Sequence, residues 1–197
     1  YRWGPYLKPW AVDMAPSARI GLQDQVDENA VAGFMRAHAP QPEELQKVTP
    51  AEVNTWLERF EIPETVAVAE RAETMTAKAA EISPDNPELQ YLLKVAKATN
   101  DLIHLFREYH QAMVCATVAR NTPDEKAKAE LVASSREHMK LAINLTADYN
   151  GIYGLLVDRI QKQRRSDYVE GCAFKDEGAM QFHRLYWDVH NVFLPCL

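Results

Sequence analysis

Helix-start signals that contain proline constrain the fold of this chain more than any other sequence feature. Thr49-Pro50-Ala51-Glu52 places a capping hydroxyl before a proline, which fits the first turn of a helix, and its glutamate completes a capping box. The same signature recurs as Thr122-Pro123-Asp124-Glu125, and the turn Ser83-Pro84-Asp85-Asn86-Pro87-Glu88 leads into a third helix start. No segment shows the alternation of polar and apolar residues that is typical of a half-buried strand. The sequence therefore predicts an all-α fold.

The distances between these three starts leave two all-α architectures open. The starts are separated by 34 and 39 positions, and each is followed by a candidate helix break, at 61–63, 99–101 and 134–135. If all three breaks form, the chain is a short helical-hairpin, α-solenoid-like array. If the second and third do not, the same residues form an antiparallel helical bundle. The bundle needs fewer assumptions, because Ser and Thr are tolerated inside helices.

Apolar spacing predicts where the long helices run. The helix after Pro87 has one apolar face, whose members recur at helical spacing: Leu102, Phe106, Tyr109 and Met113. The helix after Pro123 is expected to reach about Arg165, with a kink or an interruption at 150–151 or Gly154. Other helices are expected to end near His38, before two prolines, and to occupy about 176–193.

The first 23 residues form a separate unit in this interpretation. Three prolines and two glycines prevent residues 1–23 from forming one helix, so we expect an extended arm. Its aromatic residues include Trp3, Tyr6 and Trp10, which are costly to leave in water. The arm should therefore lie on its own domain or on a neighbouring subunit. Residues 24–197 are expected to form a single all-α domain.

Aromatic residues also gather in the last expected helix. Phe182, Tyr186 and Trp187 lie close together in the segment Phe182-His183-Arg184-Leu185-Tyr186-Trp187. Residues of this type carry much of the binding energy at protein interfaces. Together with the three aromatic residues of the arm, they are the interface candidates of the sequence.

Histidines and carboxylates supply candidate metal ligands. Asp101, His104 and Glu108 share one helical stripe with Gln111 and Cys115, opposite the apolar face, and we interpret that stripe as a solvated polar face. His138 lies on an apolar stripe and is expected to be a buried, hydrogen-bonded residue, with no carboxylate nearby in the sequence to orient it. The pattern of two ExxH steps that holds di-iron centres in bundles is absent from the sequence.

Two more histidines lie in the last expected helix. His183 and His190 share a face with Trp187, at spacings of four and seven positions. Two histidines at this spacing bind one metal or haem only with ligands from elsewhere in the chain. The candidate ligands are therefore His104, Glu108, His138, His183 and His190, and no cofactor is assigned.

Charge and motif content narrow the classes of function. The net charge of −6 argues against nucleic acid or an anionic membrane as the main partner, because both favour basic proteins. No apolar run approaches the ~18 residues of a membrane-spanning helix. The sequence contains no GxGxxG, GxxxxGK[ST], GxSxG, HExxH or CxxC motif. Common nucleotide-dependent, hydrolytic and zinc-ribbon chemistries are therefore not indicated.

Three hypotheses of function follow from the sequence. The first is a non-catalytic interaction subunit bound to other protein subunits, such as an accessory subunit of a respiratory or ATP synthase type complex. The chain begins at Tyr1 rather than Met, which is compatible with a processed protein of an organelle such as the mitochondrion, or with a fragment. The second is a small helical-bundle enzyme or carrier that binds a metal or haem. The third is an α-solenoid adaptor that binds peptides.

Overall fold

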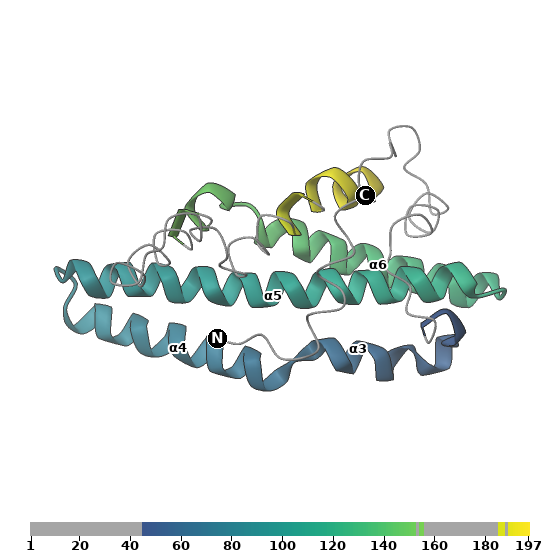
Figure 1. The fold of residues 1–197 in the computed structure, drawn as a ribbon, viewed down its shortest axis with the longest axis horizontal. Helices are drawn as coiled ribbons and strands as arrows, with labels where there is room; N and C mark the ends of the chain where they lie inside the picture. The colour runs from purple at the N-terminus through teal and green to yellow at the C-terminus, as the bar shows by residue number, and fades with distance from the viewer. Residues whose placement is uncertain (1–44, 153, 156–184, 188) are drawn as a thin grey trace, which may run out of the picture.

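The structure is a computed structural model that describes residues 45–152, 154–155, 185–187 and 189–197. All regular elements in these ranges are helical: the 3₁₀ turns η2 (Leu45–Lys47) and η3 (Pro50–Glu52), helices α3 (Val53–Glu61), α4 (Pro63–Ile82), α5 (Pro87–Asn121) and α6 (Glu125–Leu145), the π-helical turn η4 (Val189–Phe193) and the 3₁₀ turn η5 (Leu194–Cys196). Helix α5 runs the length of the molecule, with α3 and α4 along one side and α6 along the other (Figure 1). The all-α, antiparallel arrangement predicted from the sequence is confirmed.

The helix starts form where the sequence predicts them, although one capping residue differs. Glu52 Oε2 accepts hydrogen bonds from Thr49 N at 2.9 Å and from Thr49 Oγ1 at 2.7 Å, which fixes the turn that leads into α3. At the start of α6, Asp124 is the cap, since its Oδ1 accepts from Ala127 N at 2.7 Å. Thr122 instead belongs to the end of α5, where its hydroxyl donates to Val118 O at 2.7 Å.

Only the first of the three candidate breaks occurs. Ile62 separates α3 from α4 with φ 39° and ψ 51°, because the proline that follows disfavours the right-handed helical conformation at this position. Positions 99–101 and 134–135 lie inside α5 and α6. There Thr99 Oγ1 donates to Val95 O and Ser135 Oγ donates to Ala112 O, so both hydroxyls are satisfied without breaking a helix. The hairpin-array alternative is therefore wrong for this region, and the bundle is right.

Helix α6 ends earlier than the sequence predicts. It stops at Leu145, and the Thr146 hydroxyl donates to Ile143 O at 2.7 Å in a turn at 146–148. The chain is helical again over 149–152, so the interruption precedes the Asn-Gly step at 150–151 where it was expected. The reason is that Thr146 offers a local hydrogen bond that competes with the helical one.

The core is centred on the second half of α5. Between Leu105 and Ala119, every residue except Arg107 is buried, as expected for a helix surrounded by other elements. The apolar face predicted from the sequence is confirmed, with Leu102, Phe106, Tyr109 and Met113 at most 3% exposed. The C-terminal segment closes this core, because the ring of Phe193 stacks on that of Tyr109 at 5.1 Å.

Several sequence-based predictions lie outside the described residues. These are the extended arm at 1–23 with Trp3, Tyr6 and Trp10, the helix expected to end near His38, the expected helical end near Arg165, and the residues Phe182 and His183. The last expected helix is described only in part: residues 185–187 are helical, and η4 and η5 complete the segment in place of a regular α-helical end. None of the helices in the described part is sufficiently long and apolar to cross a membrane.

Candidate functional site

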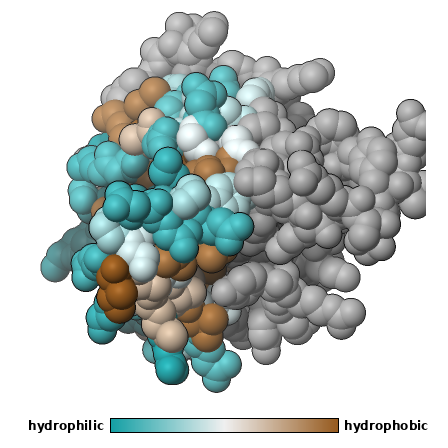
Figure 2. All heavy atoms as spheres, turned by 90° about the vertical axis from the view of Figure 1, so that its left-hand side faces the viewer, coloured by the Kyte–Doolittle hydropathy of each residue, from teal (hydrophilic) through white to brown (hydrophobic). Residues whose placement is uncertain are grey.

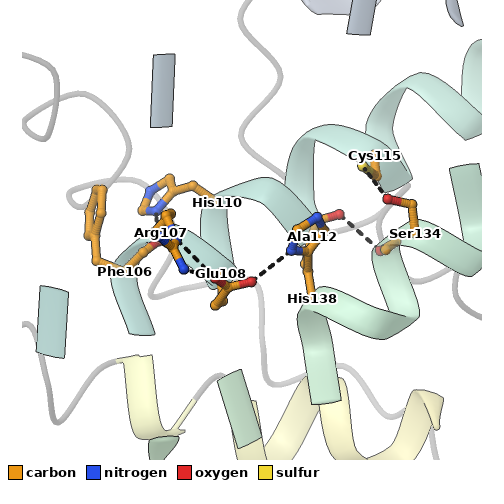
Figure 3. A network of polar contacts seen from close by, with 9 residues as sticks. Phe106, Arg107, Glu108, His110, Ala112, Cys115, Ser134 and His138 are labelled. Carbon is orange, nitrogen blue, oxygen red and sulfur yellow. Dashed lines mark hydrogen bonds and ion pairs between the residues drawn. The ribbon is translucent and has the colours of Figure 1, made fainter. Parts of the chain in front are cut away.

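A buried carboxylate joins the two longest neighbouring helices. The Glu108 side chain, on α5, is only 5% exposed and accepts a hydrogen bond from His138 of α6, with 2.7 Å between Oε2 and Nδ1. Its other oxygen, Oε1, accepts from Arg107 Nε at 2.9 Å and from Nη2 at 2.7 Å. Figure 3 shows Glu108 held between these two side chains. His138 is therefore hydrogen-bonded as predicted, but by a carboxylate that the sequence did not reveal, and its side chain is 22% exposed rather than buried.

The second half of the polar stripe of α5 is buried, which corrects its interpretation as a solvated face, whereas Asp101 and His104 are partly exposed. Glu108, Gln111 and Cys115 are at most 6% exposed, because α6 covers much of this stripe. Polar groups of α6 meet it: besides His138, Ser135 Oγ donates to Ala112 O at 2.9 Å, and Cys115 Sγ donates to Ser134 Oγ at 3.6 Å (Figure 3). The two helices thus share a polar layer within an otherwise apolar interface.

The hydrogen bonds at Glu108 fix its charge and the tautomer of its partner. Burial raises the pKa of Glu108, but the hydrogen bonds from His138 and Arg107 outweigh it, so the net pKa lies below its ordinary value. An ionised carboxylate only accepts hydrogen bonds, so His138 carries its proton on Nδ1. In its neutral form, this histidine leaves Nε2 as the ring atom able to accept a proton. A histidine oriented by a carboxylate in this way is suited to binding or proton transfer.

A cleft of about 490 Å³ opens beside this layer. It lies between α5, the end of α6 and the residues that follow α6. Its lining combines charged and apolar side chains: Lys97, Asp101, His104, Arg107, Glu108, Leu141, Asn144, Leu145, Ala147, Asp148 and Ile152. Among the lining residues, Lys97 Nζ pairs with Asp101 Oδ2 at 2.8 Å, and His104 Nε2 lies 3.6 Å from Oε1 of Glu70, which belongs to α4. The volume falls in the range of small-molecule sites.

The structure brings together only two of the five candidate metal ligands. Glu108 and His138 are in contact, His104 faces the cleft, and His183 lies outside the described residues. His190 lies elsewhere, where its Nε2 donates to Thr146 Oγ1 at 2.8 Å. Across the described ranges, no three His, Cys, Asp or Glu side chains gather as a metal site would require.

A buried histidine was missed by the sequence analysis. His110 is 1% exposed, its Nδ1 donates to Phe106 O at 2.8 Å, and its ring lies 3.9 Å from that of Phe106. Burial lowers the pKa of His110 to about 4, so the ring is neutral at physiological pH. His110 comes after the aromatic residues Phe106 and Tyr109 in α5. No feature of the sequence marked His110 as more deeply buried than its neighbours.

The aromatic interface candidates that are described contact their own chain. The Tyr186 ring stacks on Tyr149 at 3.8 Å and lies 4.3 Å from the ring of His190. Trp187 is partly buried, and its carbonyl accepts from Asn191 Nδ2 at 2.7 Å. Part of the Tyr186 ring surface is therefore used to attach the C-terminal segment to the bundle.

Helix α4 carries a row of exposed apolar residues that the sequence analysis did not single out. Val68, Met75 and Ile82 recur every seven residues and are 53%, 60% and 83% exposed. Ala72 and Ala79 alternate with them, so the row follows the four-three spacing of a coiled-coil seam. We call these five residues the α4 row.

The α4 row lies apart from the face by which α4 joins the bundle. That buried face consists of Val66, Ala69 and Ala80, of which the first two pack with Ile103 of α5. Viewed from the end of the molecule where α4 turns into α5, hydrophobic surface is exposed between hydrophilic residues (Figure 2). Helix α4 thus has two apolar faces, and the bundle uses one of them.

Comparison of the chain with models of protein families, with curated proteins and with solved structures finds no match.

Proposed function

We propose that the protein is an interaction subunit that binds another protein chain through the α4 row. The observation that carries this proposal is the exposure of Val68, Met75 and Ile82 at heptad spacing on one helix. Scattered exposed apolar residues are ordinary, but a continuous row at the spacing of a helix–helix seam marks a surface suited to another helix. The alanines between them let a second helix approach closely.

The rest of the bundle supports a structural role for the long helices. Glu108, His138 and the Ser135–Ala112 contact hold α5 and α6 in one register, because sliding either helix would leave buried polar groups without partners. A fixed α5 gives α4 a rigid support. The α4 row is therefore presented without a large ordering cost on binding.

The native mass of the protein in a mild extract of its source tests the proposal. The tagged full chain should elute well above its own 22.4 kDa, measured by size exclusion with light scattering. Met75→Glu, which places a charge at the centre of the row, should return it to the monomer mass. Leu194→Glu is the matched control, because Leu194 is 50% exposed but lies outside the α4 row. A wild-type monomer, or an unchanged mass for Met75→Glu, would overturn the proposal.

The cleft beside Glu108 favours a second candidate function, the binding of a small molecule. Its apolar wall at Leu141 and Leu145 faces polar groups of α5, among them His104. Such a mixture of one apolar wall and a few polar groups is usual for ligand sites. Thermal-shift screening of the full chain should then find ligands whose effect is lost in Leu141→Trp, which fills the cleft. Ligands that shift both proteins equally would argue against the cleft.

A further inference from the structure

We infer that the partner of the α4 row is a helix of a different protein with acidic residues along the edge that lies over Arg71 and Lys78. This inference rests on the proposed function. Arg71 and Lys78 immediately precede Ala72 and Ala79, so they border the α4 row along one side, seven residues apart. Both are exposed, and neither forms an ion pair within the part of the chain that the structure describes.

The acidic residues of α4 do not neutralise this border. Glu70 Oε1 lies 3.6 Å from His104 Nε2, and Glu73 Oε2 accepts from Asn100 Nδ2 at 2.8 Å, so both point toward α5. Glu64 lies one heptad before Arg71 and limits the basic border to about two helical turns. Glu81 lies three positions after Lys78, but no ion pair joins the two within the described residues. Over those turns, the border has a positive charge that the bundle itself does not use.

The other border of the α4 row has no charge. It is formed by Ala69, which is 2% exposed, and by Thr76, whose hydroxyl donates to Ala72 O at 2.6 Å. Among the flanking residues of α4, a helix seated on the row therefore meets charge on one side only, above Arg71 and Lys78. In coiled coils, residues at these flanking positions select the partner by opposite charge.

The same geometry disfavours a second copy of this chain as the partner. In an antiparallel pair of α4 helices whose rows overlap in full, Arg71 and Lys78 of one copy would face the same residues of the other, and like charges at these positions repel. In a parallel pair, they would face the uncharged border that contains Thr76. Neither arrangement pairs the two cations, whereas acidic residues on a different helix pair both.

Two synthetic helical peptides test the inference on the full chain. Both have the same apolar heptad seam, and their flanking positions are all Glu in one and all Lys in the other. Fluorescence anisotropy should show the Glu peptide binding about tenfold more tightly at low salt, since each of the two exposed ion pairs changes affinity by up to about fivefold. The preference should shrink as salt is raised, because the screening length is about 10 Å at 0.1 M.

Charge reversal supplies the decisive variant. The double variant R71E/K78E should prefer the Lys peptide, whereas K94E/K126E, which makes the same change of net charge at exposed positions of α5 and α6, should still prefer the Glu peptide. Equal binding of the two peptides, failure of both to bind, or an unchanged preference in R71E/K78E would overturn the inference.

The Met75→Glu variant separates this inference from the proposed function. If it loses the Glu peptide while R71E/K78E keeps its preference, the α4 row binds helices and only the acidic partner is wrong. If it binds the Glu peptide like the wild type, the α4 row is not the site, and the proposed function fails with the inference. A native assembly that consists of two copies of this chain alone would also overturn the choice of partner.

Discussion

Glu108 and His138 are thirty positions apart in the chain, yet their side chains meet across the α5–α6 interface with 2.7 Å between Oε2 and Nδ1. This contact is a hydrogen bond between α5 and α6, and it places an ionised carboxylate inside the bundle. A buried charge is tolerated only where hydrogen bonds replace its water. The Glu108–His138 contact therefore fixes the register of α5 against α6 and also stabilises the folded chain.

Removing the partner of the buried carboxylate should destabilise the bundle. In His138→Ala, Glu108 keeps Arg107 but loses the hydrogen bond at Oε2, and we expect the free energy of unfolding to fall by about 1–3 kcal/mol. Urea denaturation measures this change. The control is Lys140→Ala, which removes an exposed ion pair with Glu137 and should cost about 0.5 kcal/mol or less. Equal losses in the two variants would contradict a special role for the Glu108–His138 contact.

The buried His110 should make stability depend on pH in the weakly acidic range. Its pKa is about 4 in the folded chain and about 6.5 when exposed, so between these values the unfolded chain binds more protons. Stability is therefore complete above pH about 6.5 and is lost as the pH falls toward 4, by up to about 3 kcal/mol at about 1.4 kcal/mol per pH unit. In His110→Gln, the slope of the unfolding free energy against pH should flatten. An unchanged slope would mean that other titratable groups cause the pH dependence.

Glu108 should add to the same acid sensitivity at lower pH. Because its folded pKa is below the ordinary value, the stability it contributes is present above that value and lost as the pH falls through the folded pKa. Glu108→Gln should therefore be less acid-sensitive than the wild type, although less stable at neutral pH. Chemical denaturation of both proteins at pH 7 and at about pH 3 measures the difference, because the contribution of Glu108 is lost only below the ordinary carboxyl pKa. A larger loss on acidification in the variant would contradict this sign.

The start of α6 should depend on Asp124. Its carboxylate accepts the hydrogen bond from Ala127 N, and loss of such a cap costs about 1 kcal/mol. Asp124→Ala should lower the free energy of unfolding by that amount. Glu125→Ala, at the next position, removes only an exposed ion pair with Lys128 and should cost a few tenths of a kcal/mol. A larger loss of unfolding free energy in Glu125→Ala than in Asp124→Ala would mean that Asp124 is not the cap of α6.

Two cysteines should resist thiol reagents in the folded chain. Cys115 and Cys196 are free and 1% exposed, and burial raises the pKa of both thiols, that of Cys196 to about 11. Since the thiolate is the reactive form, both should label slowly at pH 8. The rate of thiol labelling of the folded chain should therefore be the same in the wild type and in the double variant that carries Cys115→Ser and Cys196→Ser. Fast labelling that disappears in this double variant would show that the core opens locally.

Local signals in the sequence determined much of the fold. The capping box at Thr49, the break at Ile62 and the apolar face around Phe106 were all predicted and are confirmed. Each depends on residues within one or two helical turns of one another. Hydrogen bonds, steric exclusion and apolar spacing at that range do not require knowledge of which helices pack together.

Alternative local partners account for two of the errors. Thr122 was expected to cap the helix that follows it, and Thr146 was expected to lie inside a continuous helix. The hydroxyl of each instead donates to a carbonyl of the helix that precedes it. The choice between such roles depends on small energy differences. At Thr146, the hydroxyl oxygen also accepts a hydrogen bond from His190 Nε2, a partner that only the tertiary structure supplies.

The candidate sites were decided by tertiary structure. Which polar stripe is buried depends on where α6 lies on α5, and only that placement brings Glu108 to His138. The α4 row has the same origin, because α4 is apolar on two faces and the sequence does not say which one the bundle covers. The sequence by itself determined where the capped helices begin and that the fold is all-α, whereas the tertiary structure decided that the helices form a bundle. Packing decided which of their faces remain for other molecules, because burial of a side chain belongs to the pair of helices and not to either alone.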